Sequence, residues 1–473
     1  MFFVHKASLS ETSRTDDCSA CPRTGTELRR LRVDSSLSAM SEDKAAPQRR
    51  AFANLFRATE IDARLVGMLG ALALIWIGVD ILSDGAFLTP RNLWNLSVQT
   101  ASVAVMASGM VLVIVARHID LSVGSILGFV GMIMGVTQAE FLPKYLGFDH
   151  PLIWLIALAV GLAVGAAIGL LHGAIVAYLG VPAFIVTLGG LLVWRGCAWW
   201  VTSGRTVAPM DDAFRRMGGG IEGAIGAGWT WIVALLAFAA IIWRTLHARR
   251  RRRQVGFALR PVWAEVTVAG LACLAVLAVV LVVNSYDLPP RVAERIAAER
   301  GLVVPPQGLS IAHGIALPVL IAVGVGVVVT FLAQRTRFGR YVFALGGNPE
   351  ATELSGVDTR RVTVLVFVLM GMLCAVAAAI STARLNAATN AQGTLDELYV
   401  IAAAVIGGTS LGGGLGTVAG AMLGALVMQS LQSGMVLMGL DTPLQNIVVG
   451  VVLVVAVWLD RLYRSRTLKG SAG

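Results

Sequence analysis

Long runs of apolar residues, most of them about 20 residues in length and nearly free of charge, constrain this 473-residue chain more than any other feature. Only 14% of its residues are charged, whereas soluble domains carry about 25%. A helix rises about 1.5 Å per residue, so roughly 20 apolar residues cross the hydrocarbon core of a bilayer. The pattern therefore predicts an all-α, polytopic integral membrane protein with about twelve transmembrane helices.

The predicted spans alternate with polar loops. The shortest of them, Leu398–Leu411, ends in a glycine cluster and is open to two interpretations, a short crossing or a broken, re-entrant helix. The spans are Leu65–Leu82, Trp94–Ala116, Leu121–Gln138, Leu152–Leu179, Ala183–Val201, Trp229–Leu246, Val262–Val283, Ala312–Ala333, Val362–Ala383, Leu398–Leu411, Gly416–Val436 and Pro443–Leu459.

Basic residues gather in alternate loops. The basic segments are Arg244–Pro261, Gln334–Arg361 and the tail Asp460–Lys469. The loops of mixed charge, which we place outside, are Glu140–Pro151, Asn284–Ser310 and Arg384–Glu397. Because cytoplasmic loops collect Lys and Arg, this alternation predicts that both termini lie in the cytoplasm.

The net charge of +10 does not indicate a nucleic-acid partner. The densest basic run, Arg249–Arg253, lies between two predicted spans, so we interpret it as a juxtamembrane loop near membrane lipid. Residues 1–60 are polar and lack an apolar targeting segment, which predicts a disordered cytoplasmic tail with Met40 as an alternative translation start. Residues 61–464 then form the transmembrane unit and 465–473 a cytoplasmic tail.

Glycines recur every fourth residue in two predicted spans. A four-residue step places them on one helix face, where a neighbouring backbone can approach closely. The two series are Gly161, Gly165, Gly169 and Gly173, and Gly416, Gly420 and Gly424. They predict tight helix–helix packing.

The sequence carries no recognisable catalytic or nucleotide-binding set. No lysine follows a glycine, so a P-loop is absent, and any ATP that drives the protein must bind another chain. The six histidines are scattered, and Cys18 and Cys21 form a lone pair with no second half of a zinc site. We expect no metal, no cofactor and no enzymatic activity. Acids are nearly absent from the predicted spans, which weighs against a proton-coupled carrier.

Two polar loops stand out. In the first, Asp120 precedes an apolar helix whose first turn holds Ser122 and Ser125, a pattern typical of a helix N-terminus. In the second, Pro349 fits a first helical position and Gly356 a stop, so a short helix is expected within Thr336–Arg361. That helix is either a plain surface turn or a contact for a motor protein.

These two loops, with a third segment, resemble those of a known family. Three segments are similar to segments of bacterial ABC importer permeases for monosaccharides, in the branched-chain amino acid/ribose/xylose superfamily. They are the string Asp120-Leu121-Ser122-Val123-Gly124-Ser125, the loop with Gly347-Asn348-Pro349-Glu350-Ala351 and Ser355-Gly356-Val357, and the run Ile406 to Thr417. The lengthened middle, Trp229–Ser310, resembles the xylose-transport permeases. Arg117 and His118 replace glycines found in many sugar permeases, so the sugar and the role of this basic pair stay open.

The resemblance implies a type II ABC importer-like permease in the inner membrane. It implies a second permease copy, a cytoplasmic sugar ABC ATPase and a periplasmic sugar-binding protein as partners. The residues expected to couple to the ATPase are Asn348, Pro349, Glu350, Ala351, Ser355 and Gly356; the family motif comprises Asp120, Leu121, Ser122, Gly124 and Ser125; and the glycine-rich segment comprises Gly407, Gly408, Gly412, Gly413 and Gly416.

The residues that line the path are less constrained. Gln99, Ser102, Asn386 and Asn390 are candidates because sugars need hydrogen-bond partners, although helix–helix hydrogen bonds explain the same residues. Two alternative functions remain at this stage: a branched-chain amino acid permease of the same superfamily, and a proton-coupled secondary sugar carrier.

Overall fold

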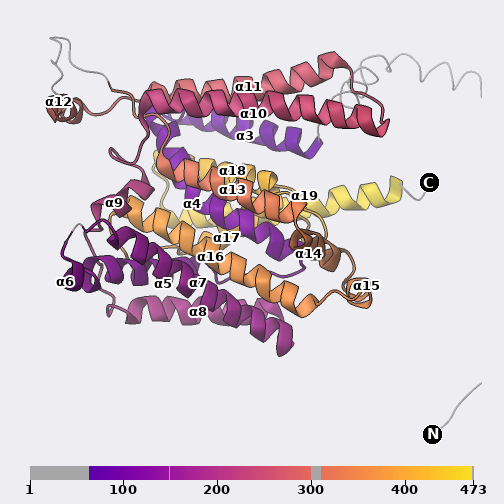
Figure 1. Ribbon diagram of the computed structural model, residues 1–473, viewed down its shortest axis with the longest axis horizontal. Coiled ribbons are helices and arrows are strands. Elements are labelled where there is room, and N and C mark those ends of the chain that lie inside the picture. Colours follow the sequence, from indigo (N-terminus) through magenta and orange to yellow (C-terminus); the bar gives the residue numbers. More distant parts are fainter. Residues whose placement is uncertain (1–62, 149, 300–310, 471–473) are drawn as a thin grey trace, which may run out of the picture. The chain divides into compact units, whose positions relative to one another are not determined.

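The computed structural model describes residues 63–148, 150–299 and 311–470. Within them every regular element is a helix (Figure 1). Ten helices are long and apolar enough to cross a membrane, which confirms an all-α polytopic membrane protein. They are α3 (Ala63–Leu82), α4 (Pro90–Val115), α5 (Val123–Val136) with its extension to Leu146, α7 (Ile153–Tyr178), α8 (Ala183–Trp200), α10 (Gly226–Val255), α11 (Val262–Asn284), α13 (Leu317–Arg335), α16 (Thr359–Leu385) and α18 (Val418–Leu437).

Two predicted spans, Pro443–Leu459 and Leu398–Leu411, differ from this pattern. Helix α19 (Thr442–Gly470) is apolar over Thr442–Trp458. The span predicted at Leu398–Leu411 is wrong as a continuous crossing, because the helix there, α17, runs only from Asp396 to Ile406. Its 11 residues are about 16 Å long, roughly half the thickness of the hydrocarbon core. The broken-helix interpretation is the one that fits.

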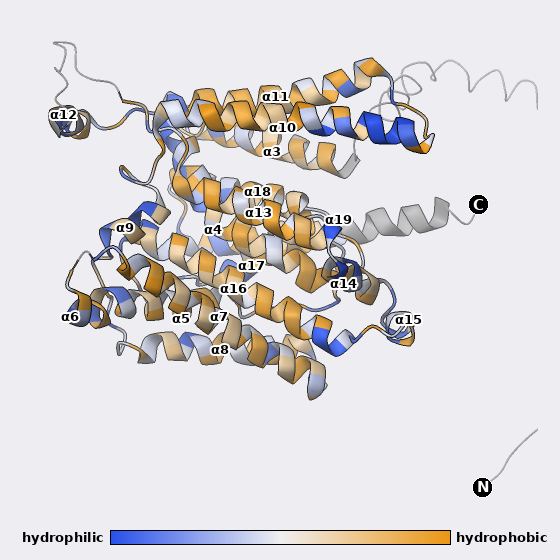
Figure 2. Ribbon diagram, viewed as in Figure 1, coloured by the Kyte–Doolittle hydropathy of each residue, from blue (hydrophilic) through white to orange (hydrophobic). Residues whose placement is uncertain are grey.

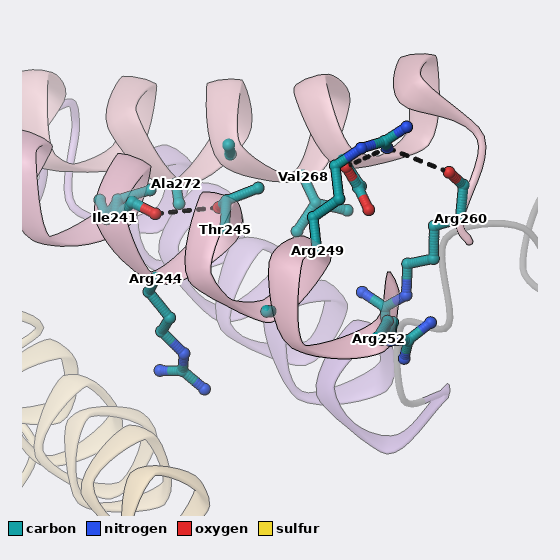
Figure 3. A pocket seen from close by; sticks show the side chains of 11 residues that line it. Ile241, Arg244, Thr245, Arg249, Arg252, Arg260, Val268 and Ala272 are labelled. Atoms are coloured by element: carbon teal, nitrogen blue, oxygen red, sulfur yellow. Dashed lines mark hydrogen bonds and ion pairs between the residues drawn. The ribbon is translucent and has the colours of Figure 1, made fainter. Parts of the chain in front are cut away.

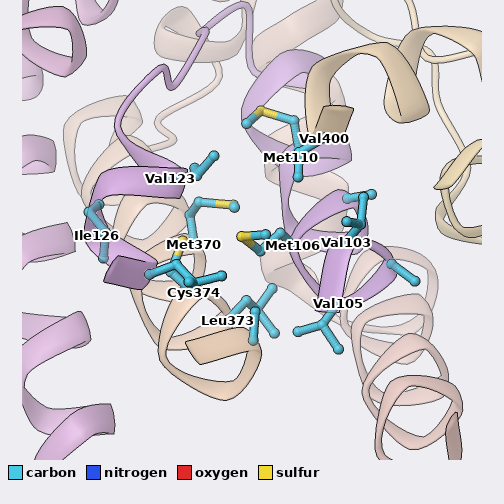
Figure 4. Packing of buried hydrophobic residues seen from close by; sticks show 14 of the residues in the cluster. Val103, Val105, Met106, Met110, Val123, Ile126, Met370, Leu373, Cys374 and Val400 are labelled. Atoms are coloured by element: carbon cyan, nitrogen blue, oxygen red, sulfur yellow. The ribbon is translucent and has the colours of Figure 1, made fainter. Parts of the chain in front are cut away.

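Helix α4 forms the centre of the bundle. In its apolar window 94% of the residues are buried, against 11% in α10 and α11. It packs against α13, α16, α17 and α18, and Figure 4 shows Met106 and Met110 of α4 facing Met370, Leu373 and Cys374 of α16. A helix that is apolar on every side is typical of a span enclosed by other helices.

The predicted glycine faces pack as expected. A Cβ atom on Gly165 or Gly169 of α7 would collide with the backbone of α16 at Gly371 and Phe367, and one on Gly371 would collide with the backbone at Gly165. On α18, Gly420 lies against Gly407, and Gly424 against Ala403 of α17. These contacts bring helix backbones together at distances that only glycine permits.

Short helices cap the two ends of the bundle. At one end lie α14 (Arg337–Gly347) and α15 (Pro349–Leu354), together with the basic end of α10 (Figure 2). We call this the arginine-rich end. At the other end lie α6 (Pro143–Leu146), α9 (Asp212–Arg215), the 3-10 turn Arg216–Gly218 and α12 (Pro290–Glu299). A π-helical turn, Thr137–Phe141, joins α5 to α6.

Several sequence predictions fall outside the described residues. They are the disordered tail 1–60, the alternative start at Met40, the pair Cys18 and Cys21, and the last three residues of the predicted tail 465–473.

The close approach of α7 and α16 makes Gly371 a test of the packing. We expect Gly371→Ala to destabilise the protein by about 1–3 kcal/mol, because the added methyl group must displace backbone atoms of α7. Gly324→Ala on α13 is the matched control, since nothing lies within 4 Å of its Cβ position. Thermal unfolding in detergent measures both. Equal stability of the two variants would contradict the packing argument.

Candidate functional site

Three segments far apart in the sequence meet at the arginine-rich end. They are the end of α4, the end of α14 and the glycine-rich run after α17. The backbone N–H of Gly414 donates to the carbonyl oxygen of Val115 at 3.0 Å. A Cβ on Gly346 would collide with that same carbonyl oxygen and with the nitrogen of Gly414. We call this contact the three-loop junction, defined by Val115–Arg117, Gly346–Gly347 and Gly413–Gly414.

Arg117 fastens the junction. Its guanidinium donates from Nε to the carbonyl oxygen of Gly346 and from Nη2 to that of Gly347, both at 2.8 Å. These carbonyls close α14, where a cation is stabilised by the helix dipole. Arg117 itself has a left-handed φ of 65°, so the chain turns sharply as it leaves α4. The residue that departs from many sugar permeases therefore contacts α14 in this structure.

The family motif continues into a buried polar chain. Asp120 is 1% exposed and accepts hydrogen bonds from the N–H of Ser122 at 2.9 Å and from its hydroxyl at 2.5 Å. Ser122 Oγ lies 3.4 Å from Nδ1 of His172 on α7. Trp194 of α8 donates its indole N–H to Nε2 of His172 at 3.0 Å. Since an indole can only donate, Nε2 accepts, and a neutral His172 carries its proton at Nδ1.

This chain fixes the start of α5 against two other helices. Asp120 was expected to act as an N-cap, and it does accept a backbone N–H there, although the capping position is Ser122. Leu121 is half-buried beside it. Ser125 is buried, and its hydroxyl has no hydrogen-bond partner among the described residues. Deleting one member would leave buried polar atoms without partners, which costs about 1–3 kcal/mol.

A second irregular segment, residues 386–395, follows α16. It starts at the end of α5 opposite the arginine-rich end, where Ala388 lies against Gly135 and pairs with Val207. Further along, the backbone of Gln392 packs on Gly128, and that of Gly393 on Gly124. From Gly135 to Gly124 the segment covers roughly 16 Å of helix axis. We call residues 386–395 the re-entrant segment.

The re-entrant segment overturns part of the predicted topology. Arg384–Glu397 was expected to be an outer loop, and that prediction is wrong for residues 388–397, which lie along α5 inside a membrane-spanning layer. Asp396 and Glu397, which begin α17, therefore lie inside the bundle, and Glu397 is 7% exposed.

Arg195 of α8 supports the re-entrant segment. Its Nη1 donates to the carbonyl oxygens of Asn390 at 3.0 Å and Gln392 at 2.7 Å. The side chain of Gln392 exchanges hydrogen bonds with Thr382 of α16. Asp396 and Glu397 lie within electrostatic range of Arg195. The sequence analysis missed Arg195, Asp396 and Glu397 as interior charges.

The sequence contains a glycine pattern that indicates this arrangement. Besides the two series that we identified, α5 carries its own glycine stripe, Gly124, Gly128, Gly131 and Gly135. It marks the face on which the re-entrant segment lies.

The remaining predicted residues fall into separate places. Asn348 caps α15 by accepting the N–H of Ala351 at 3.1 Å, and Pro349 opens the helix. The coupling residues Asn348, Glu350, Ala351, Ser355 and Gly356 are all exposed. In the glycine-rich segment, Gly407 packs on Gly420, Gly413 contacts Arg117 and Gly416 contacts Val111, whereas Gly408 and Gly412 lie in the turn between them.

The four candidate path residues do not form one cluster. Gln99 of α4 accepts from Gln429 of α18 at 3.4 Å, and Ser102 donates to the carbonyl of Ala377 in α16. Asn386 and Asn390 belong to the re-entrant segment instead. The side chain of Asn386 accepts the N–H of Met210 at 3.0 Å.

Comparisons with known proteins agree with this architecture. A family model described as branched-chain amino acid transport system / permease component matches residues 92–457. The chain is 36% identical over 400 residues to the xylose transport system permease protein XylH of Escherichia coli (strain K12), covering 85% of this chain and 92% of that protein.

Two further relatives give a similar result. The chain is 34% identical over 410 residues to XylH of Haemophilus influenzae, covering 86% of this chain and 98% of that protein. It is 33% identical over 393 residues to the ribose import permease protein RbsC of Escherichia coli (strain K12), covering 83% and 92% respectively. No solved structure matches the chain. Because the family model spans most of the chain, this protein belongs to the family of branched-chain amino acid transport system permease components.

Proposed function

We propose that this protein is the transmembrane permease subunit of an ATP-driven importer of xylose or another monosaccharide, in the inner membrane. Family membership supports the class of transporter, and the relatives named for xylose and ribose favour a sugar over a branched-chain amino acid. The same relatives disfavour a proton-coupled carrier. Residues 61–464 make up the permease unit, with both termini and the arginine-rich end in the cytoplasm.

The position that we propose for the substrate path is argued from the re-entrant segment. Non-helical backbone at membrane depth is tolerated only where it is buried in protein or lines a water-filled cavity. Residues 386–395 run beside α5, yet Ala391 and Thr394 are exposed, and Asn390 and Asp396 are half-exposed. Lipid would leave these polar groups without partners. We therefore place the substrate path along this face, closed by a second permease copy.

The three-loop junction supports a route for coupling. Helix α15 presents exposed side chains, including Leu354 at 90% exposure, at the surface where a cytoplasmic ATPase would dock. Its Asn348 follows directly after Gly347, whose carbonyl binds Arg117. Two residues separate Arg117 from Asp120, and the chain before Gly414 continues back to α17 and the re-entrant segment. A displacement of α15 would thus reach both Asp120, before the start of α5, and the re-entrant segment. This route requires no reaction in the permease, only different affinities of its two conformations for the partners.

The coupling surface is tested by Glu350→Arg and Gly356→Trp. We expect both variants to abolish sugar uptake while inserting normally into the membrane, because both residues are exposed and lie outside the packed core. Uptake of labelled xylose or ribose, with membrane content by immunoblot, measures this.

Matched controls exist at the other end of the bundle. Glu294→Arg changes an exposed acid of α12, and Gly439→Trp changes a glycine that shares with Gly356 a positive φ and open surroundings. Both controls should transport. Normal uptake by Glu350→Arg and Gly356→Trp would refute the placement of the coupling surface.

The junction is tested by Arg117→Ala. Loss of two charge-assisted hydrogen bonds, each worth about 1.5–3 kcal/mol, should loosen α14 from α4 and lower uptake at least about tenfold. ATP hydrolysis by the reconstituted transporter should persist, so that the ratio of sugar moved to ATP hydrolysed falls. Arg205→Ala, which removes an exposed ion pair with Glu140, is the control. An unchanged ratio in Arg117→Ala would exclude Arg117 from coupling.

The path is tested by cysteine chemistry in a background without the five native cysteines. We expect Thr394→Cys to react with a membrane-impermeant maleimide and to yield dimers with a short bismaleimide, because the residue faces water and the second copy. Leu236→Cys, at a position of α10 where the native side chain is 65% exposed, should do neither. If Thr394→Cys neither reacts with the maleimide nor forms crosslinked dimers with the bismaleimide, the proposed path is overturned.

A further inference from the structure

The hairpin of α10 and α11 has a basic end that the proposed transport function does not use. The two helices pack on each other, and most of their surface is exposed. Helix α10 has 30 residues and is therefore about 45 Å long, more than the hydrocarbon core of about 30 Å. Its last turns, with Arg249–Arg253, thus reach the depth of the lipid headgroups.

A cavity of about 430 Å³ opens between the two helices at this end (Figure 3). Four arginines and one acid line it, giving four positive charges against one negative, a balance of +3. Arg249 is committed within the protein, since its Nη1 binds Glu265 at 2.7 Å and the carbonyl of Arg260 at 3.4 Å. Arg244, by contrast, makes no side-chain hydrogen bond or ion pair among the described residues.

The cavity changes from charged to apolar along the helix axes. Figure 3 shows Arg252 and Arg260 close together near the loop, and Ile241 and Ala272 further along the hairpin. Val268 continues the apolar part. A phospholipid has the same order, with a phosphate at the surface and acyl chains below it.

On the other face of α10 a second cavity, of about 920 Å³, shares Arg244 and Arg252 with the first. It adds Arg251, Arg335 and His247 to the lining. Positive charge therefore lies on both sides of this end of α10, and Glu265, the acid among the residues that line the two cavities, is bound to Arg249.

We propose that the cavity between α10 and α11 binds the phosphate of an anionic glycerophospholipid of the cytoplasmic leaflet. Guanidinium groups match phosphate oxygens in a two-pronged geometry. The cytoplasmic leaflet carries anionic lipid, and basic pockets between transmembrane helices on that side bind such headgroups. The apolar floor selects a lipid over free phosphate, because it contacts the first carbons of the acyl chains.

Native mass spectrometry of the detergent-purified full-length chain, titrated with phosphatidylglycerol or phosphatidylcholine, tests the site. We expect retained phosphatidylglycerol, and about a thirtyfold weaker affinity in the double variant Arg244→Gln/Arg252→Gln, since each of the two arginines near a headgroup contributes about 1 kcal/mol. Arg244→Gln alone removes no hydrogen bond or ion pair among the described residues, so we attribute a loss of lipid in this variant to the site and not to misfolding.

The matched control is Arg250→Gln/Arg253→Gln, which removes the same charge from exposed positions outside both cavities. Because neither residue lines a cavity, this control should weaken lipid binding much less than Arg244→Gln/Arg252→Gln does. Equal weakening of the two double variants would overturn the site in favour of diffuse attraction. Equal retention of phosphatidylcholine would overturn the requirement for an anion. Displacement of the lipid by millimolar inorganic phosphate would overturn a lipid as the ligand.

Discussion

Inside a bilayer every backbone N–H and C=O must find a partner within the protein, and this requirement explains how the re-entrant segment is held in the bundle. The re-entrant segment breaks the helical pattern at membrane depth, so its carbonyls need donors from elsewhere. Arg195 supplies two hydrogen bonds from α8, and the glycine stripe of α5 lets the segment approach closely enough to be reached. A larger side chain at Gly124 or Gly128 would push the backbone away from its donors. The glycines of α5 and Arg195 thus together satisfy the backbone carbonyls of the re-entrant segment.

The sequence predicts what depends on local composition. Eleven of the predicted spans correspond to apolar helices, because hydropathy over about 20 residues reflects a property of the segment alone. The short helix opened by Pro349 was predictable for the same reason, since capping is a local interaction. The glycine series of α7 predicted a closely packed partner helix, although the sequence did not indicate that this helix is α16.

What the sequence could not predict depends on contacts between distant residues. Asp396 and Glu397 look like loop residues, and only the packing of Gly393 and Glu397 on Gly124 places them inside the bundle. Arg195 looks like an isolated charge in a span until its two carbonyl partners, almost 200 residues away, are known. Arg117 likewise gains its role from carbonyls about 230 residues further along the chain. In each case a polar side chain is explained by a backbone group that no local pattern reveals.

The three-loop junction and the α10–α11 hairpin show two different uses of arginine. Arg117 is bound to the last carbonyls of α14, so a movement of α14 must either carry α4 with it or break two charge-assisted bonds. Arg244 has no such internal partner, and its charge remains available to a ligand at the membrane surface. We propose that the first arrangement transmits motion between segments of the core. The second fixes a peripheral hairpin, 11% buried, to its surroundings. Because α10 and α11 contact little of the core, an anionic lipid bound between them would hold the hairpin still while the central helices rearrange.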